Sequence, residues 1–379
     1  MPRPSHSRTL PLALAALFLP SLAAAQESVT RAPDLPARSD LVRVEHDSAA
    51  HVVDVVLGPF QLMAGMPHLR APIQLAHMPV DGWLHAFEAV IEDADGNALP
   101  SELLHHVNFI DPDHRELFSP IARRVIAAGR ETHKQELPRL LGIPLTSSDR
   151  MLISAMFANP TGQDYPEAYL HVRLSYSRED EGIIAPRDVY PFYLDVMGPL
   201  GVKDFPVPPG RTEMAWEGSP AIEGRILGIG GHLHDYATEL RFEDATEDRV
   251  LWRAEPEHDE TGRVVGVPTG KLWWRGGVKI HPDHRYRIVV VYDNPMDRAA
   301  PDGGMGAIGG VLWAAKGVEW PTFDRANPDY VADLRATLTA PERLKGHGHG
   351  EHGMPGMDME KKPEGGAPGS HTHGDRSGR

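Results

Sequence analysis

The sequence of 379 residues contains no cysteine and has few basic residues, 38 Lys and Arg against 53 Asp and Glu. Without cysteine the chain forms no disulfide bonds, so its stability must come from packing, and any metal must be held by His, Met or carboxylate groups. Long apolar runs are also scarce. Only residues 10–25 are predominantly apolar, which is short for a transmembrane helix. These absences disfavour a disulfide scaffold, a thiolate metal site and a membrane anchor.

The apolar run at the N-terminus has the pattern of a secretory signal peptide. Arg3 and Arg8 precede it and small residues end it, so we expect cleavage between Ala25 and Gln26. The mature protein is then expected to be periplasmic or secreted. Its net charge of −15, which becomes −17 when Arg3 and Arg8 are removed, disfavours nucleic acids and anionic membranes as partners.

From Leu41 to Lys316 the chain consists of short runs of alternating polar and apolar residues, separated by clusters of Pro, Gly, Asn and Asp. This pattern predicts antiparallel β-sheets, arranged as sandwiches or jelly rolls. Helices are expected in only two places, at residues 119–137 and 327–338. Each of these segments begins with a capping residue followed by proline.

The two halves of the chain resemble one another loosely. In the first half a histidine pair precedes a strand that ends in ANP at Asn159, and in the second half His232 precedes a strand that ends in DNP at Asn294. We therefore expect an all-β protein of two tandem antiparallel jelly-roll β-sandwich domains, with few helices and a disordered C-terminal tail. The expected segments are a signal peptide (1–25), a leader (26–40), an N-terminal sandwich (41–197), a C-terminal sandwich (198–320), a short helix and linker (321–345) and a His- and Met-rich tail (346–379).

Histidine is abundant, with 21 residues, and one pair has the spacing of metal ligands on a strand. His232 and His234 lie two residues apart in GGHLHDYATEL, so both rings project from the same face of a strand. The alternative is a strand on the protein surface, where two histidines with this spacing face solvent and bind no metal. Gly230 and Gly231 permit a close approach of backbone or ligand, and Asp235 is placed to orient one of the rings.

Two further motifs carry candidate ligands. His105 and His106 are adjacent, so both reach one metal only at a bulge or strand end, or through different ring nitrogens. Otherwise one ring is buried and the other exposed. Met305 lies among five glycines in DGGMGAIGGVLW, and its thioether is of the kind that binds Cu(I). The alternative is an ordinary methionine at the end of a strand.

The order of these landmarks resembles the copper type II, ascorbate-dependent monooxygenases, the family of peptidylglycine α-hydroxylating monooxygenase and dopamine β-monooxygenase. The resemblance covers roughly residues 70–316 and includes LLHHV, MLISAMFANPTG, FPVPPG, GGHLHDYATEL and GGMGAIGGVLW. It implies two jelly-roll domains that face each other across a solvent cleft, each with one copper. His232, His234 and Met305 match the ligands of the copper that activates dioxygen, and His105 and His106 match a pair at the electron-donating copper.

One position departs from this family's pattern. The third ligand of the electron-donating copper is a histidine on the strand that ends here in MLISAMFANPTG, and Met156 occupies the best-matching position. Either Met156 is the ligand, or His114, His133 or His171 replaces it, or this copper site is weakened.

The resemblance implies an exported copper-dependent monooxygenase, an enzyme that hydroxylates a C–H bond of a small or peptide-like substrate. It would use dioxygen and either ascorbate or another electron donor. The alternative is a non-catalytic periplasmic copper-binding protein, a buffer or chaperone on the same fold, which Met156 and the tail favour. The tail either captures copper or only adds solubility. A third alternative is a jelly-roll binding or scaffolding module without metal.

Overall fold

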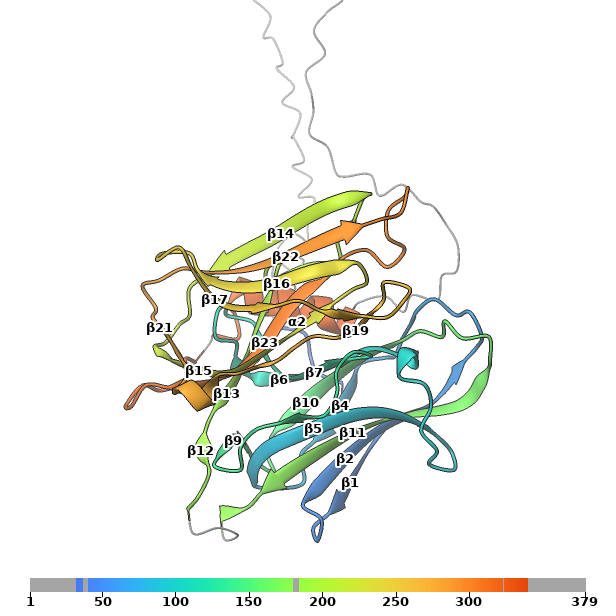
Figure 1. The fold of residues 1–379 in the computed structure, drawn as a ribbon. Helices are drawn as coiled ribbons and strands as arrows, with labels where there is room; N and C mark the ends of the chain where they lie inside the picture. The colour runs from blue at the N-terminus through green and yellow to red at the C-terminus, as the bar shows by residue number, and fades with distance from the viewer. Residues whose placement is uncertain (1–31, 37–39, 180–183, 323, 340–379) are drawn as a thin grey trace, which may run out of the picture. The chain divides into compact units, whose positions relative to one another are not determined.

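The computed structural model describes residues 32–36, 40–179, 184–322 and 324–339, and the regular secondary structure of this part of the chain consists almost entirely of β-strands (Figure 1). The predicted all-β class is confirmed. The signal peptide, most of the leader and the His- and Met-rich tail lie outside the described residues. Within the described part, no helix is long and apolar enough to cross a membrane.

A first pair of sheets encloses one hydrophobic core. Val53, Val55 and Leu57 of one sheet are fully buried and belong to the same cluster as Val107 and Phe109 of the other. The seven-stranded sheet contains β1 (Val42–Asp47), β2 (Val52–Leu62), β11 (Tyr165–Ser177), β5 (Gly82–Asp93), β9 (Leu141–Leu145) and β12 (Arg187–Asp188) in spatial order, with β8 (Gln135–Glu136) paired to β5. The β6 sheet contains β3 (Leu69–Arg70), β10 (Arg150–Phe157), β6 (Leu104–Arg115) and β7 (Ala122–Gly129), with β4 (Gln74–His77) paired to β10.

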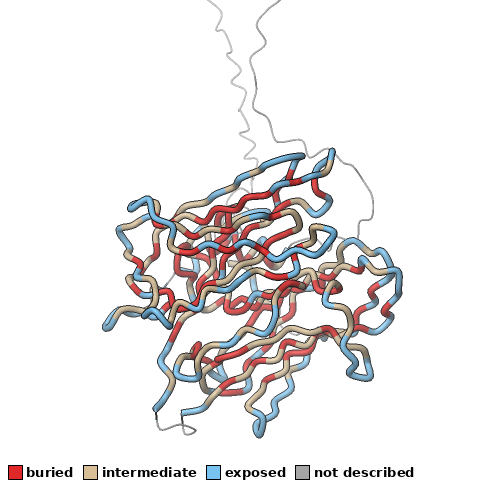
Figure 2. Tube along the Cα trace, viewed as in Figure 1, coloured by how far each residue is buried: buried red, intermediate tan, exposed pale blue. Residues whose placement is uncertain are grey.

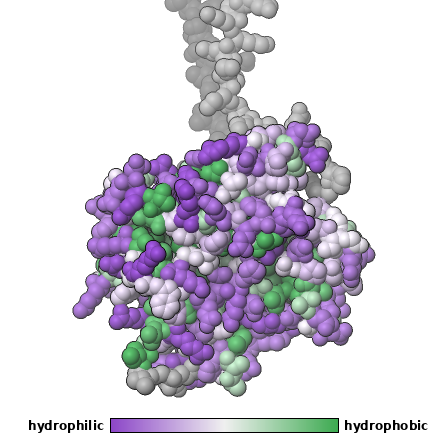
Figure 3. Space-filling model, viewed as in Figure 1, coloured by the Kyte–Doolittle hydropathy of each residue, from purple (hydrophilic) through white to green (hydrophobic). Residues whose placement is uncertain are grey.

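A second pair of sheets encloses another core, in which Ile229 and Leu233 pack with Phe242, Ile288 and Val290. The β15 sheet contains β13 (Tyr190–Asp195), β23 (Gly306–Ala314), β15 (Gly224–Leu233) and β20 (Gly270–Lys271), with β21 (Val278–Ile280) paired to β15. The β22 sheet contains β14 (Gly210–Gly218), β22 (Tyr286–Asn294), β16 (Ala237–Asp244) and β17 (Arg249–Ala254). A small hairpin is formed by β18 (Glu257–His258) and β19 (Val264–Gly266). Buried positions follow the strands of both pairs (Figure 2), whereas the face seen in Figure 3 is mostly hydrophilic with separate apolar areas.

The likeness of the two halves extends to the turns that follow ANP and DNP. Asn159 donates its amide to the carbonyl oxygens of Leu62 and Gln163, and its own side-chain oxygen accepts the N–H two residues later. Asn294 repeats this arrangement with the carbonyl oxygens of Val207 and Arg298. Each buried asparagine thus fixes the chain after a central strand in the same way, which accounts for the sequence likeness.

The two pairs of sheets meet where β7 contacts β13 (Figure 1). Although β13 falls within the range expected for the N-terminal sandwich, it pairs with β23 of the second. Glu116, which follows β6, is buried beside this contact. Its carboxylate accepts backbone N–H bonds from Leu117 and Arg124 of the first half and from Tyr193 of β13. One carboxylate therefore ties together backbone from both halves.

The helix predicted over residues 119–137 is wrong, because this segment forms β7 and β8. Its helix-forming residues are overridden by pairing with β6, where a strand completes the sheet. The helix predicted over residues 327–338 is confirmed as α2 (Pro328–Thr339), and the Asn327 side chain accepts the N–H of Asp329 at its start.

The buried Glu116 predicts a specific pH dependence of stability. Burial raises the pKa of Glu116 to about 7, against the opposite effect of its N–H donors and of Arg124. Since this folded-state pKa lies above the unfolded value of about 4.3, the group's contribution to stability is present at low pH and is lost as the pH rises through 7. We expect a fall of about 3 kcal/mol in the free energy of unfolding from this group between pH 4.5 and 7.5.

Urea unfolding at several pH values measures this effect. The Glu116→Gln variant should lack that part of the fall, whereas the exposed Glu45→Gln should keep the wild-type slope. Equal slopes in wild type and Glu116→Gln would contradict the assignment.

Candidate metal centre

The adjacent histidines of β6 lie at a β-bulge. Met156 of β10 pairs with His106, but the next residue of β10, Phe157, pairs with Leu104. His105 is therefore the extra residue on β6, and the bulge brings its ring to within 5.1 Å of the His106 ring, measured between centroids. Of the arrangements that the sequence left open, the structure shows the bulge.

The second histidine pair lies at the end of β15. The centroids of the His232 and His234 rings are 5.4 Å apart, as expected for same-face positions, while Leu233 between them packs into the core of the second half. His234 is only 5% exposed, and its Nδ1 lies 3.1 Å from the carbonyl oxygen of Asp302.

These two pairs come from different halves of the chain but form one cluster. The ring centroid of His105 lies 5.1 Å from that of His234, and the centroid of His106 lies 6.3 Å from that of His232. The pocket that His105, His232 and His234 line holds no space for a water molecule. The resemblance implied one copper in each half, separated by a solvent cleft, whereas the structure places all four predicted histidines together. We call these four residues the histidine cluster.

Three ring nitrogens of the histidine cluster are buried without a hydrogen-bond partner: Nδ1 of His106 and Nε2 of both His232 and His234. A buried polar atom left unpaired costs about 1–3 kcal/mol, so three such atoms in one cluster require an explanation. Burial, together with the neighbouring histidines, lowers the pKa of His106 to about 3 and of His234 to about 4. These rings are neutral at physiological pH, which is the state that binds a metal.

The spacing of the rings also suits metal binding. Two imidazoles bound to one ion through bonds of about 2.0–2.1 Å have centroids about 4.5–6.4 Å apart, and the separations within the histidine cluster run from 5.1 to 6.3 Å. Within the described part of the chain, ligand atoms of three residues lie within 4.8 Å of one another only at Asp244, Glu247 and His284, outside this cluster. Binding of one ion by three of the clustered rings therefore requires rotation of at least one ring.

Glu131 orients His232. The Glu131 carboxylate, 4% exposed, lies 2.7 Å from Nδ1 of His232 and accepts its N–H, which leaves Nε2 free. Burial opposes ionisation of both groups, but their mutual attraction and hydrogen bond lower the pKa of Glu131 and raise that of His232. The same carboxylate lies over Gly129, where a Cβ would come within 2.5 Å of Oε2, and Gly129 pairs with His106. The Glu131 carboxylate therefore lies between the two histidine pairs: it is hydrogen-bonded to His232 and lies next to the residue that pairs with His106.

Asp235, which the sequence placed as the orienting carboxylate, has another role. It forms an ion pair with Arg130 and accepts the backbone N–H of Val264. The role of Glu131 was not predicted, because a helix over residues 119–137 would not have placed its side chain opposite a histidine of the other half.

Tyr292 connects Met305 to the cluster. Its hydroxyl accepts the backbone N–H groups of His234 and Met305 and donates to the Met305 carbonyl oxygen. The backbones of His234 and Met305 are therefore held by the same hydroxyl group. Met156 pairs with His106 across β10 and β6, so both side chains are on the same face of that sheet. Both predicted methionines thus come from positions adjoining the histidine cluster.

Comparisons with known proteins give only distant structural likenesses. No protein-family model matches the chain, and no curated protein matches its sequence. The structure of PNGF-II is similar with a TM-score of 0.36 and 10% identity, over 75% of this chain and 63% of that chain, so the match spans less than two thirds of that protein. Recombinant N-glycanase F (PNGase F) is similar with a TM-score of 0.35 and 10% identity, over 72% of this chain and 100% of that chain.

The Glu131→Gln variant tests the orienting role of this carboxylate. The amide keeps the size but loses the charge that holds the His232 tautomer, so copper affinity should fall by about 10–100-fold. Competition with a chromophoric copper chelator measures the affinity. The exposed Glu136→Gln is the matched control and should bind as wild type does. An affinity of Glu131→Gln within twofold of the control would contradict the role.

Proposed function

We propose that this is an exported copper protein whose centre is the histidine cluster, and that the copper-loaded centre hydroxylates a C–H bond of a small or peptide-like substrate. The observation that carries this proposal is the set of three unpaired, buried imidazole nitrogens contributed by both halves. Imidazole binds several transition metals, and without cysteine the soft donors of the chain are methionine thioethers, two of which, Met156 and Met305, belong to residues whose backbone adjoins the cluster. Soft sulfur favours copper over the harder ions.

Bound copper would supply one-electron redox chemistry and an open position for dioxygen, with ascorbate or another donor as the reductant. The chain's own residues prepare this centre. Glu131 fixes which nitrogen of His232 is free, and the Asp302 carbonyl does the same for His234. Tyr292 holds the backbone of Met305 beside them. The pocket has no space for a water molecule, and the three unpaired ring nitrogens that would hold the ion are buried from bulk water.

The proposal includes the finer features that the resemblance implies. The two pairs of sheets would be tandem jelly rolls, and the protein would act in the periplasm or outside the cell. The His- and Met-rich tail, which lies outside the described residues, would capture copper for the centre. No nucleic-acid partner is proposed, because of the acidic net charge.

A second candidate function is a copper buffer or chaperone without catalysis. The narrowness of the pocket favours it, since a site with no space for a water molecule has none for a substrate until the halves or side chains move. Both candidates use the same ligands and differ only in what happens after copper is bound.

Copper content and oxygen transfer separate these functions. The full mature chain is loaded with copper, dialysed and analysed for bound metal, as wild type, His232→Ala and the exposed control His133→Ala. It is then supplied with ascorbate, ¹⁸O₂ and a panel of short peptides and acylated amino acids.

If the protein is a monooxygenase, wild type and His133→Ala should transfer ¹⁸O to a product. His232→Ala should transfer none and should also lose copper. Copper bound without ¹⁸O transfer would favour the buffer or chaperone. Equal copper in all three proteins would contradict both functions.

A further inference from the structure

A fifth histidine, His68, lies against the histidine cluster. The centroids of the His68 and His105 rings are 4.6 Å apart, in an edge-to-face arrangement with an interplanar angle of 62°. His68 lies outside the sequence motifs that carry the predicted ligands. Its separation from His105 falls within the range of about 4.5–6.4 Å expected for two imidazoles on one ion.

The position of His68 follows from strand pairing. His68 directly precedes β3, whose two residues Leu69 and Arg70 pair with Phe157 and Met156 of β10. Met156 also pairs with His106 on the other side of β10. The short strand β3 therefore holds His68 near the end of β10, where β6 has its bulge.

His105 connects His68 to the rest of the cluster. Its ring contacts His68 as well as His106 and His234. The buried unpaired nitrogens, in contrast, belong to His106, His232 and His234. Three of the five rings therefore carry the buried, unpaired nitrogens, and His68 and His105 lie next to these three rings.

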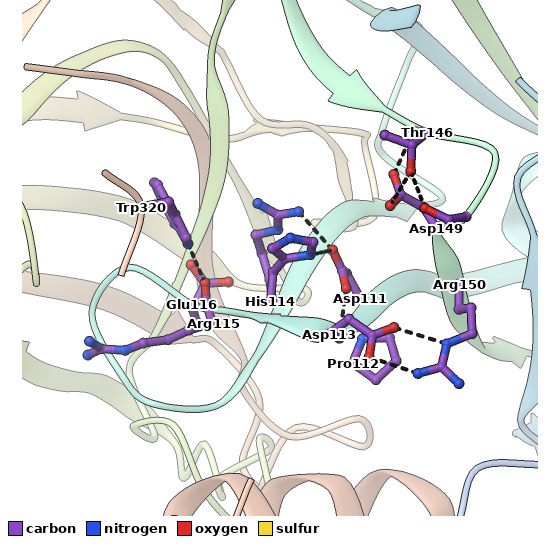
Figure 4. Close-up of polar contacts among 12 residues, drawn as sticks. Asp111, Pro112, Asp113, His114, Arg115, Glu116, Thr146, Asp149, Arg150 and Trp320 are labelled. Atoms are coloured by element: carbon purple, nitrogen blue, oxygen red, sulfur yellow. Dashed lines mark hydrogen bonds and ion pairs between the residues drawn. The ribbon is translucent and has the colours of Figure 1, made fainter. Parts of the chain in front are cut away.

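The other first-half histidines considered as replacements for Met156 are engaged elsewhere or exposed. His114 Nδ1 lies 2.8 Å from an Asp111 carboxylate oxygen (Figure 4). His171 Nδ1 lies 2.9 Å from an Asp54 carboxylate oxygen. His133 is exposed.

We propose that His68 and His105 form a second copper-binding position, beside the one formed by His106, His232 and His234. In this arrangement His68 supplies the histidine that the strand containing Met156 lacks. The inference rests on the proposed copper function. It predicts that the cluster holds two copper ions, with the second bound by a residue that precedes the region of resemblance.

Copper retained by the full chain after dialysis tests the inference. His68→Ala should lose one copper equivalent relative to His133→Ala, and Met156→Leu should lose none. His68→Gln keeps the size of the side chain and should behave as His68→Ala does, while thermal unfolding of the metal-free proteins checks that each variant is folded. Cu(II) electron paramagnetic resonance of His68→Ala should retain the signal of the first copper ion and lose that of the second.

The outcomes distinguish this inference from the proposed function. If His232→Ala loses copper but His68→Ala and His68→Gln match the control, the inference is overturned and the function stands. If Met156→Leu loses the ion and the His68 variants keep it, Met156 is the ligand and the inference is overturned. If no variant loses copper, the proposed function itself fails.

Discussion

The structure depends on one constraint: imidazole nitrogens are buried between two sheets without hydrogen-bond partners. Burying these nitrogens away from water is unfavourable in the metal-free protein. The surrounding residues determine which nitrogen of each ring is left without a partner. The bulge on β6 turns both His105 and His106 toward the cluster. The Glu131 carboxylate then selects the free nitrogen of His232. A site of this kind stores unfavourable free energy that a bound ion relieves.

The cluster also couples the two halves of the chain. Each pair of sheets has its own core, and each supplies histidines to the site, so an ion bound by residues of both halves stabilises the docked arrangement by a free energy that grows with the logarithm of its affinity. Other contacts hold the same junction without metal. Glu116 accepts N–H groups from both halves, and the guanidinium of Arg124 in β7 lies over the ring of Tyr193 in β13. The junction is therefore preformed, and ion binding adds to it.

Local sequence patterns predicted the parts of this structure that depend on local geometry. Alternation gave the all-β class, Asn327 and Pro328 marked the start of α2, and the spacing of His232 and His234 gave same-face rings. Contacts between the halves could not be predicted from the sequence, because the spacing of residues within one strand does not specify which residues lie opposite them on another sheet. Glu131 is the clearest case: the predicted helix concealed it, and its partner lies about a hundred residues later.

The most direct test of the central claim is a double-mutant cycle between the halves, with His106→Ala and His234→Ala made singly and together in the full chain. Copper retained after dialysis is measured against His133→Ala. If the two residues bind one ion, each single variant and the double variant should lose the same single equivalent. If each single variant loses one equivalent and the double variant loses two, the histidines serve separate sites, and the account of a shared centre is contradicted.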